Sequence, residues 1–353
     1  CHHQMSAMRG HRSIAATLWL LVLTAGVAQA QFASETRTVT RAGTAAAEFL
    51  SIPIGARATA MGSAVSATID DPTAIYWNPA GLTGLTRGTF TAEYAQWLAD
   101  ISVNYVAVAT PLGAGTVGIG VTAVRTPEME ETTVEQQEGT GRTFTAASYA
   151  VALSYARALT DRFSIGGSVK FITERISFST ASGLALDIGT LFVMPFRGIR
   201  LGAAITNFGT KMRMRGDDLL TIVDIDPNNR GNNTSNRAEL RTDPFDLPLT
   251  MRIGLAGEVW QRDGYRLTLA VDALSPSNSS QYVNVGAELG LLGDLLLLRG
   301  GYSELFLTDS AHTFSLGGGL RYRFGAFHVT FDYAYEGWRY FNGVNRFTLM
   351  VGF

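Results

Sequence analysis

Apolar and polar side chains alternate along most of this chain, and the alternation limits its fold more than any other feature. In the segment 312–324 the even positions include Phe314, Leu316 and Tyr322, while the odd positions carry Thr, Ser, Gly and Arg. Successive side chains of a β-strand point to opposite faces, so such a segment has one apolar and one polar face. The segments 265–273, 327–335 and 345–353 alternate in the same way. The chain is therefore predicted to consist mainly of strands.

The length of the alternating segments distinguishes a membrane barrel from a soluble sandwich, which would alternate as well. Most segments have roughly nine to thirteen residues, the length that a tilted strand needs to cross a bilayer. Their polar faces carry mostly Gly, Ala, Ser and Thr with scattered charges, as expected for residues that line a lumen. The fourteen predicted strands are 86–95, 102–111, 115–126, 144–158, 164–178, 183–195, 200–207, 249–260, 265–273, 281–289, 295–302, 312–324, 327–335 and 345–353.

The connections between these strands alternate in length. Short turns are predicted at 112–114, 160–162, 197–198, 262–264, 291–294 and 325–326. The intervening connections are mostly longer, at about 127–143, 208–248, 274–280, 303–311 and 336–344. Short turns at one end and long loops at the other are typical of bacterial outer-membrane barrels, in which the short turns face the periplasm.

Closure of the barrel accounts for the composition. The chain is 46% hydrophobic and 16% charged, yet after residue 30 it has no apolar run of about 18 residues that could form a spanning helix. An even number of antiparallel strands can close on itself, which pairs every backbone group and leaves no edge exposed to lipid. Because the short turns follow the even-numbered strands, both termini are predicted on the periplasmic side of the outer membrane.

The N-terminal 30 residues have the parts of a secretory signal peptide. Arg9 and Arg12 precede the apolar stretch 14–27, which ends in Ala28-Gln29-Ala30. A charged start, a short apolar core and an A-x-A end predict cleavage after Ala30; a membrane anchor is the alternative, although the stretch is short for one. The only cysteine, Cys1, lies before this site, so the mature chain is expected to function outside the cytoplasm without disulfides.

Several classes of function are disfavoured by the sequence. With 28 basic and 30 acidic residues and a pI near 6.3, the chain lacks the charge of a nucleic-acid binder. Gly113–Gly118 matches G-x-G-x-x-G, but a strand rather than a helix follows it, so it predicts a hairpin turn instead of a dinucleotide site. His312 and His328 are the only histidines after the signal peptide, which leaves no His/Cys zinc set. His328 and Asp332 share a strand face but are too far apart for a hydrolase relay. We expect no enzymatic activity, cofactor or metal.

Residues 31–85 do not alternate and form the second predicted region of the chain, between the signal peptide (1–30) and the barrel (86–353). Thr44–Phe49 could be a short helix, and the segment after it is rich in Gly, Ala and Pro. Small residues suit packing inside a barrel, so this region is interpreted as a hatch; a loosely tethered arm is the alternative. The predicted fold class is therefore all-β, a 14-stranded antiparallel transmembrane β-barrel with an N-terminal hatch.

The segment 49–82 resembles the N-terminal signature of the PorV/PorQ family, which belongs to the wider FadL-like group of outer-membrane barrels. The resemblance rests on Phe49-Leu50, on Gly55-Ala56-Arg57-Ala58 with Met61-Gly62, and on the hatch motif, which comprises Asp70, Asp71, Pro72, Trp77, Asn78, Pro79, Ala80 and Gly81. In the FadL-like group the Asn-Pro-Ala stretch belongs to a hatch in the lumen of a 14-stranded barrel. The resemblance thus implies the same placement for Asn78, Pro79 and Ala80.

The resemblance implies one of two functions. PorV-like members serve the type IX secretion system, in which they receive cargo with C-terminal signal domains from the translocon and carry it to a surface attachment complex. FadL-like transporters instead admit fatty acids or other hydrophobic molecules through the hatch and a lateral opening. The motif favours the secretion role, and passive transport of a fatty acid or hydrocarbon is the alternative.

The loop 208–248 is the predicted site of partner binding. Loops longer than about 12–15 residues are usually functional or disordered. This one combines a polar run, 226–236, with apolar residues that a loop without a partner has no need to expose. The predicted partner-binding residues are Met212, Met214, Leu219, Leu220, Ile222 and Val223. A solvated loop without a partner is the alternative.

Overall fold

The computed structural model describes residues 41, 43–196, 198–226, 228–229, 235–308 and 310–353. The predicted signal peptide and residues 31–40 of the predicted hatch region lie outside this part of the chain. None of the helices in the described part has the length and apolar character that a bilayer span requires. The described residues belong to one unit, Arg41–Phe353.

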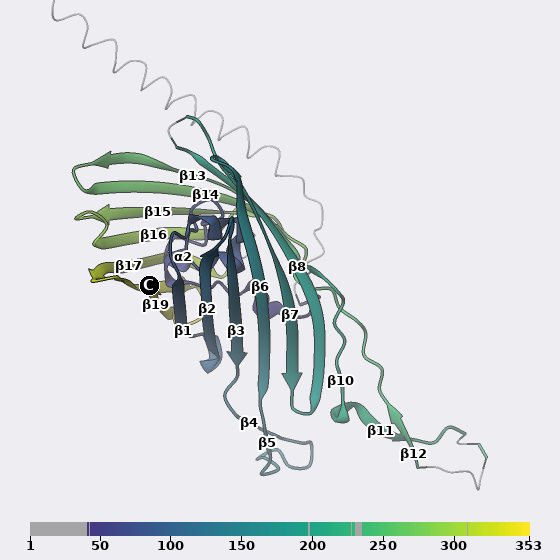
Figure 1. Cartoon of the computed structure of the whole chain (residues 1–353). Coiled ribbons are helices and arrows are strands. Elements are labelled where there is room, and N and C mark those ends of the chain that lie inside the picture. Colours follow the sequence, from purple (N-terminus) through teal and green to yellow (C-terminus); the bar gives the residue numbers. More distant parts are fainter. Residues whose placement is uncertain (1–40, 42, 197, 227, 230–234, 309) are drawn as a thin grey trace, which may run out of the picture. The chain divides into compact units, whose positions relative to one another are not determined.

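Fourteen antiparallel strands form a closed β-barrel (Figure 1). They are β1 (Thr89–Gln96), β2 (Ser102–Leu112), β3 (Gly115–Arg125), β6 (Ala146–Thr160), β7 (Phe163–Ile176), β8 (Ser179–Val193), β9 (Arg200–Gly209), β13 (Thr250–Arg262), β14 (Tyr265–Pro276), β15 (Tyr282–Leu291), β16 (Leu296–Leu305), β17 (His312–Phe324), β18 (Phe327–Trp338) and β19 (Val344–Gly352). Each pairs with the next along the chain, which confirms the predicted number and order of strands.

The first and last strands close the barrel. Strand β1 pairs with β19 over its whole length, from Thr89 opposite Gly352 to Gln96 opposite Asn345. The backbone N–H of Phe353 also donates to the carbonyl oxygen of Gly88 at 2.8 Å. An open edge of this length would present unpaired N–H and C=O groups to lipid at a cost of several kcal/mol each, which pairing removes.

The side chains of the strands divide between the lipid face and the lumen as the alternation predicts. In β17, Phe314, Leu316 and Leu320 are at least half exposed, whereas Ser315 between them is buried. The same division runs around the barrel, and its outer face carries Val, Ile, Leu, Phe and Tyr side chains with exposures of about 36–71%. Such a continuous apolar surface is stable in lipid and not in water.

The two ends of the barrel differ as predicted. The connections β2–β3, β6–β7, β13–β14 and β17–β18 are tight turns of two residues each. The turn between β2 and β3 contains Gly113 with φ of 61°, so the G-x-G-x-x-G match is a hairpin. The opposite end carries connections of five or more residues, except for the two-residue turn between β7 and β8. At the short-turn end the β8–β9 connection, 194–199, is longer than the turn predicted at 197–198. Both Thr89 and Gly352 lie at the short-turn end.

Short strands and one helical turn extend the two longest loops. The β3–β6 loop contains β4 (Met129–Glu130) paired with β5 (Thr143–Phe144). In the β9–β13 loop, β10 (Arg215–Gly216) pairs with β8, and after η4 (Asp217–Leu219) the strands β11 (Leu220–Val223) and β12 (Asn236–Glu239) form a hairpin (Figure 1). A single turn, η3 (Leu98–Asp100), lies between β1 and β2.

Within the described residues, four short helices lie in the hatch, which the barrel strands enclose (Figure 1). They are η1 (Glu48–Ser51), α2 (Ala56–Ala60), α3 (Ala74–Trp77) and η2 (Pro79–Gly84). The predicted helix at Thr44–Phe49 is wrong. Ala47 has the left-handed conformation, with φ of 53°, so helical geometry begins only at Glu48.

Candidate functional site: the hatch and the lumenal cavity

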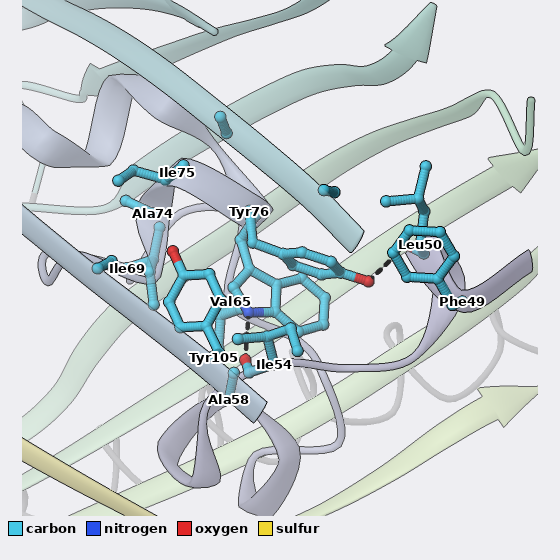
Figure 2. Packing of buried hydrophobic residues seen from close by; sticks show 14 of the residues in the cluster. Phe49, Leu50, Ile54, Ala58, Val65, Ile69, Ala74, Ile75, Tyr76 and Tyr105 are labelled. Atoms are coloured by element: carbon cyan, nitrogen blue, oxygen red, sulfur yellow. Dashed lines mark hydrogen bonds between the residues drawn. The ribbon is translucent and has the colours of Figure 1, made fainter. Parts of the chain in front are cut away.

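Two aromatic residues of α3 hold the first part of the hatch in place. The Tyr76 hydroxyl donates to the carbonyl oxygens of Leu50 and Ile52, at 2.7 and 2.9 Å. The Trp77 Nε1–H donates to the carbonyl oxygen of Ile54 at 2.7 Å. Figure 2 shows the Tyr76 hydroxyl directed at the Leu50 segment. The carbonyl groups of Leu50, Ile52 and Ile54, at and after the end of η1, thus find donors in these two side chains.

Asn78 connects three segments of the structure. Its Oδ1 accepts from the Ala80 N–H at 3.2 Å and caps η2, in which Pro79 takes the first position. Its Nδ2 donates to the carbonyl oxygen of Ser66 at 2.8 Å and to that of Thr190 in β8 at 3.1 Å. The Asn-Pro-Ala stretch of the hatch motif therefore starts a helical turn and fastens it to the barrel wall. Asn78 and Ala80 are fully buried between these segments.

Glycines on the lumenal face of the wall make room for the hatch backbone. A Cβ on Gly166 would lie 2.5 Å from the carbonyl carbon of Pro79, and one on Gly202 would lie 2.1 Å from the Ser66 carbonyl oxygen. The same holds across the barrel, where a Cβ on Gly301 would lie 2.1 Å from the Gly62 nitrogen. These are backbone atoms, which no side-chain rotation can move aside. Part of the high glycine content is thus explained by contact with the hatch.

Polar side chains of the wall accept hydrogen bonds from backbone N–H groups of the hatch. Asp272 in β14 accepts from the N–H of Val65 and Ser66 at 3.0 and 2.9 Å, and from the Ser66 hydroxyl at 2.6 Å. The other acceptors are Glu93 for Gly55, Thr348 for Ala56, Ser315 for Gly62 and Glu174 for Ala47. They come from β1, β19, β17 and β7, so the hatch is fastened around the barrel.

Arg57 of the hatch enters an ion-pair network on the wall. It pairs with Asp70, and its guanidinium nitrogens lie 3.4 Å from carboxylate oxygens of Asp71 and of Glu288 in β15. Partial burial of Asp70, whose side chain is 51% exposed, opposes its ionisation, but the charge of Arg57 and its hydrogen bond outweigh this and lower the pKa of Asp70. Burial raises the pKa of Asp71, whose Oδ1 accepts from the Thr73 N–H at 2.8 Å. Both aspartates of the hatch motif therefore organise the hatch itself.

The ion-pair network extends along the inner face of the wall, between side chains of β14, β15, β16 and β18. Glu288 lies 2.7 Å from Arg299 Nε and 2.8 Å from Arg266 Nη2, and Arg299 Nη1 lies 2.6 Å from Asp332. Arg299 is therefore the partner of Asp332, and His328 is not. Within the described residues no cluster of His, Cys, Asp and Glu has the arrangement of a metal site.

A cavity of about 310 Å³ lies against the hatch at the long-loop end of the lumen. We call it the lumenal cavity. Hatch residues, among them Leu50, Tyr76 and Trp77, form one side. The wall strands and the loops between them contribute Trp97, Arg252, Leu274, Pro276, Asn278, Tyr282, Asn284, Glu304, His312, Glu336 and Trp338. Its size falls at the lower end of the range of about 300–1,000 Å³ for small-molecule sites, and its mixture of aromatic and polar groups is typical of them.

A second depression lies at the rim, between the η3 loop and residues 341–345. This rim groove has a volume of about 600 Å³ and is lined in part by Tyr94 and Phe347, which are exposed on the outer face of the barrel. Trp97 lines both the rim groove and the lumenal cavity. Its ring packs edge-on against Trp338, with centroids 5.2 Å apart. One aromatic side chain therefore borders both spaces.

The six predicted partner-binding residues fall into two groups. Met212 is 1% exposed and forms a backbone bridge with Phe245, and Met214 packs against the hydrophobic core. Leu219 is half-buried in η4. Only Leu220, Ile222 and Val223 of β11 are exposed, at 51%, 69% and 41%. The first group folds back onto the barrel, since strand β8 extends beyond β9 and Gly183 leaves space for Met212.

Sequence reasoning did not single out Arg252, Trp97 or Trp338. Arg252 occupies an inward position of β13, between the outward Met251 and Ile253. A charged residue among the apolar and small residues of 250–257 was the available signal. The two tryptophans stand at strand ends beside the long loops, and nothing local in the sequence shows that they meet.

The comparisons with known proteins identify the fold. No protein-family model and no curated protein sequence matches the chain. Among solved structures, it is similar to the toluene transporter TodX of Pseudomonas putida, at 13% identity and a TM-score of 0.55, over 84% of this chain and 96% of that one. It is also similar to the monoaromatic hydrocarbon channel CymD, at 13% identity and a TM-score of 0.56, over 85% and 96% of the two chains. A FadL homologue of Pseudomonas aeruginosa matches at 12% identity and a TM-score of 0.50, over 85% and 98%. The chain therefore has the fold of the FadL-type barrels.

Proposed function

We propose that this protein lies in a bacterial outer membrane, with its short turns and both termini in the periplasm, and passively conducts a hydrophobic small molecule. The lumenal cavity is the observation that carries the proposal. A closed barrel whose lumen is filled by a hatch would need no cavity lined by aromatic side chains at its outer end. The solved structures that share its fold include a toluene transporter and a monoaromatic hydrocarbon channel, which supports the same reading. No chemical step is involved in this function.

Filling the cavity tests the proposal. Ser303 lines the lumenal cavity, and its neighbour Tyr302 is on the outer face of β16. Uptake of radiolabelled toluene and decane is measured in cells with and without the protein, and in cells with Ser303→Trp or Tyr302→Trp. We expect the protein to accelerate uptake of at least one compound, Ser303→Trp to abolish the acceleration and Tyr302→Trp to retain it. Equal uptake with and without the protein would contradict the proposal.

A second candidate function is protein binding in type IX secretion, as the resemblance to PorV/PorQ implies. The exposed β11–β12 hairpin favours it, because Leu220 and Ile222 lie on one face of a two-stranded sheet without a covering segment among the described residues. A photo-crosslinking amino acid at Ile222 is expected to capture secreted proteins or translocon components, whereas one at the exposed Gln137 in the β3–β6 loop is not. Identical capture from both positions, or none in cells that secrete such cargo, would count against this function.

A further inference from the structure

Three arginines and a histidine gather on the lumenal side of the barrel at its short-turn end. They are Arg87, Arg321, Arg323 and His328, which we call the mouth cluster. The strands that carry or flank them, β17, β18, β19 and β1, are neighbours in the sheet. Arg321 and Arg323 are on either side of Tyr322, whose ring is exposed on the outer face. Because side chains alternate along a strand, the two arginines face inward.

The register of these strands brings the four side chains together. Arg323 and His328 are directly opposite each other on β17 and β18, and the Cβ atoms of such pairs are about 5 Å apart. His328 is in turn opposite Gly352 of β19. A Cβ on Gly352 would lie 2.9 Å from Cδ of Arg87 and 3.6 Å from Cβ of His328, so both side chains flank this glycine. The charges of all three arginines act on His328.

The mouth cluster has little acidic compensation. Asp294 lies at its edge, with Oδ2 4.0 Å from Arg321 Nη1, but its other oxygen is 3.1 Å from Arg266. Among the described residues, no carboxylate lies within ion-pair distance of Arg87 or Arg323. Like charges on neighbouring strands repel each other when they share a face. An anion bound between these side chains would relieve that repulsion.

The charges of the mouth cluster are accessible, unlike those deeper in the lumen. Arg346 is fully buried and has a carboxylate oxygen at 2.7 Å, so its charge is compensated within the wall. The side chain of Arg321 is 42% exposed, and Arg323 is exposed as well. The exposed carboxylate of the hatch, Asp70, pairs with Arg57 instead. A molecule that approaches this end of the barrel can therefore reach uncompensated guanidinium groups.

The width of the mouth cluster indicates what kind of anion fits it. From β17 to β1 it extends over about 14 Å, at about 4.8 Å per strand, so a single phosphate or carboxylate contacts only part of it. An extended peptide repeats side chains on one face about every 6.8 Å, and three alternate acidic residues therefore span about 14 Å as well. Guanidinium groups bind carboxylates through two parallel hydrogen bonds. Lipid headgroups surround the outer face of a barrel, whereas these side chains face inward.

We propose that the mouth cluster is a docking site for an extended acidic segment of another protein, whose carboxylates pair with Arg87, Arg321 and Arg323. The proposed function places the short-turn end in the periplasm, so the partner is a periplasmic protein, held where a conducted molecule leaves the lumen. This location rests on the proposed function, whereas the binding itself does not.

A matched pair of peptides tests the proposal on the full-length protein in detergent. One labelled peptide alternates Glu with Ser, and the other carries Gln in place of every Glu. Their affinities are measured by fluorescence anisotropy at low and at physiological salt. We expect the Glu peptide to bind about tenfold tighter than the Gln peptide at low salt, the combined effect of several exposed ion pairs. The difference should shrink at physiological salt, because salt screens exposed charges.

Variants of the mouth cluster assign the preference to its arginines. In the double variant Arg87→Gln and Arg323→Gln, the Glu peptide should bind within about threefold of the Gln peptide, because two of the ion pairs are lost. Arg262→Gln is the matched control. Arg262 is exposed at the same end of the barrel but has the carboxylate of Asp263 at 3.2 Å, so its loss should leave the preference unchanged.

Three results would overturn the proposal. The first is equal affinity of the unaltered protein for the two peptides, which decides the matter even if the variants do not fold. The second is an unchanged preference in the double variant. The third is displacement of the Glu peptide by an equal concentration of inorganic phosphate or glycerol phosphate, which would identify a site for a small anion or a lipid headgroup. Failure of the proposed function is separate, because it appears in hydrocarbon uptake and leaves peptide binding unaffected.

Discussion

Replacing Gly202 by alanine should loosen the hatch while leaving the barrel intact. A Cβ at this position would lie 2.1 Å from the carbonyl oxygen of Ser66 and 2.5 Å from its carbonyl carbon. Ordinary contacts between heavy atoms lie near 3.5–4.0 Å, so the hatch backbone must retreat by about 1 Å or more. The φ of Gly202 is not in the left-handed region, so alanine suits the wall strand itself.

The cost follows from the contacts of the displaced segment. Overpacking in a well-packed interior costs about 1–3 kcal/mol. A shift of this size also stretches the 2.8 Å hydrogen bond from Asn78 Nδ2 to the Ser66 carbonyl, which contributes about 0.5–1.5 kcal/mol. We therefore expect local opening of the hatch to become easier by about 2–3 kcal/mol, or about 30- to 150-fold in its equilibrium constant.

A buried thiol reports this opening. Ala67 is 1% exposed and follows Ser66, so Ala67→Cys in a chain with Cys1→Ser has a single, protected cysteine. Its maleimide labelling rate should rise by the same factor in Gly202→Ala. Gly318→Ala is the matched control, because its Cβ would point outward and meet nothing closer than 3.5 Å. Equal labelling rates in the two backgrounds would refute the claim that wall glycines hold the hatch in position.

Three further outcomes are expected. Glu93→Ala removes the carboxylate 2.7 Å from the fully buried Arg346, so the free energy of unfolding should fall by about 3 kcal/mol. Heat-dependent gel mobility measures this, and Glu93→Gln should lower the free energy of unfolding by less. Hydrogen bonds from Arg142 lower the pKa of Glu131 from 4.5. Because the folded-state pKa is depressed, this loop contact is fully present above pH 4.5 and is lost as pH falls through the lowered pKa. The NMR shift of the Glu131 carboxylate should report the lowered pKa in the unaltered protein and not in Arg142→Gln. Trp97→Ala should join the rim groove to the lumenal cavity, because Trp97 lines both, and hydrocarbon uptake should rise several-fold. Unchanged uptake would show that Trp97 does not limit access, and Trp260→Ala on the outer face is the control.

The barrel could be predicted from the sequence because the alternation of apolar and polar residues is a local pattern. A strand that faces lipid on one side and a lumen on the other must alternate, and Phe314, Ser315 and Leu316 show this in three consecutive residues. The same property explains why the fourteen strands were found with ends within a few residues of the structure. The number of strands and the alternation of turn and loop lengths then indicate closure without any further information.

The hatch was predictable only as a region. Absence of alternation in 31–85 and its small residues predicted that it was not part of the wall. The helix expected at Thr44–Phe49 does not form, because Ala47 takes a left-handed conformation. Likewise the apolar stretch of the β9–β13 loop looked uniform in sequence. Met212 is nevertheless buried against Gly183, while Ile222 is exposed. Which residues of such a segment are covered depends on where the chain returns to the barrel.

The amino-acid sequence by itself determined the alternation, the strand lengths and hence the wall, since each depends on neighbouring residues that share one environment. Only the tertiary structure decided what the inward residues do. Asp272 and Arg252 occupy inward positions of adjacent strands and look equivalent in the sequence. Asp272 accepts hydrogen bonds from the hatch, and Arg252 lines the cavity with no carboxylate at ion-pair distance among the described residues. That difference arises because the backbone of Val65 and Ser66, more than 200 residues away along the chain, donates hydrogen bonds to Asp272 and not to Arg252.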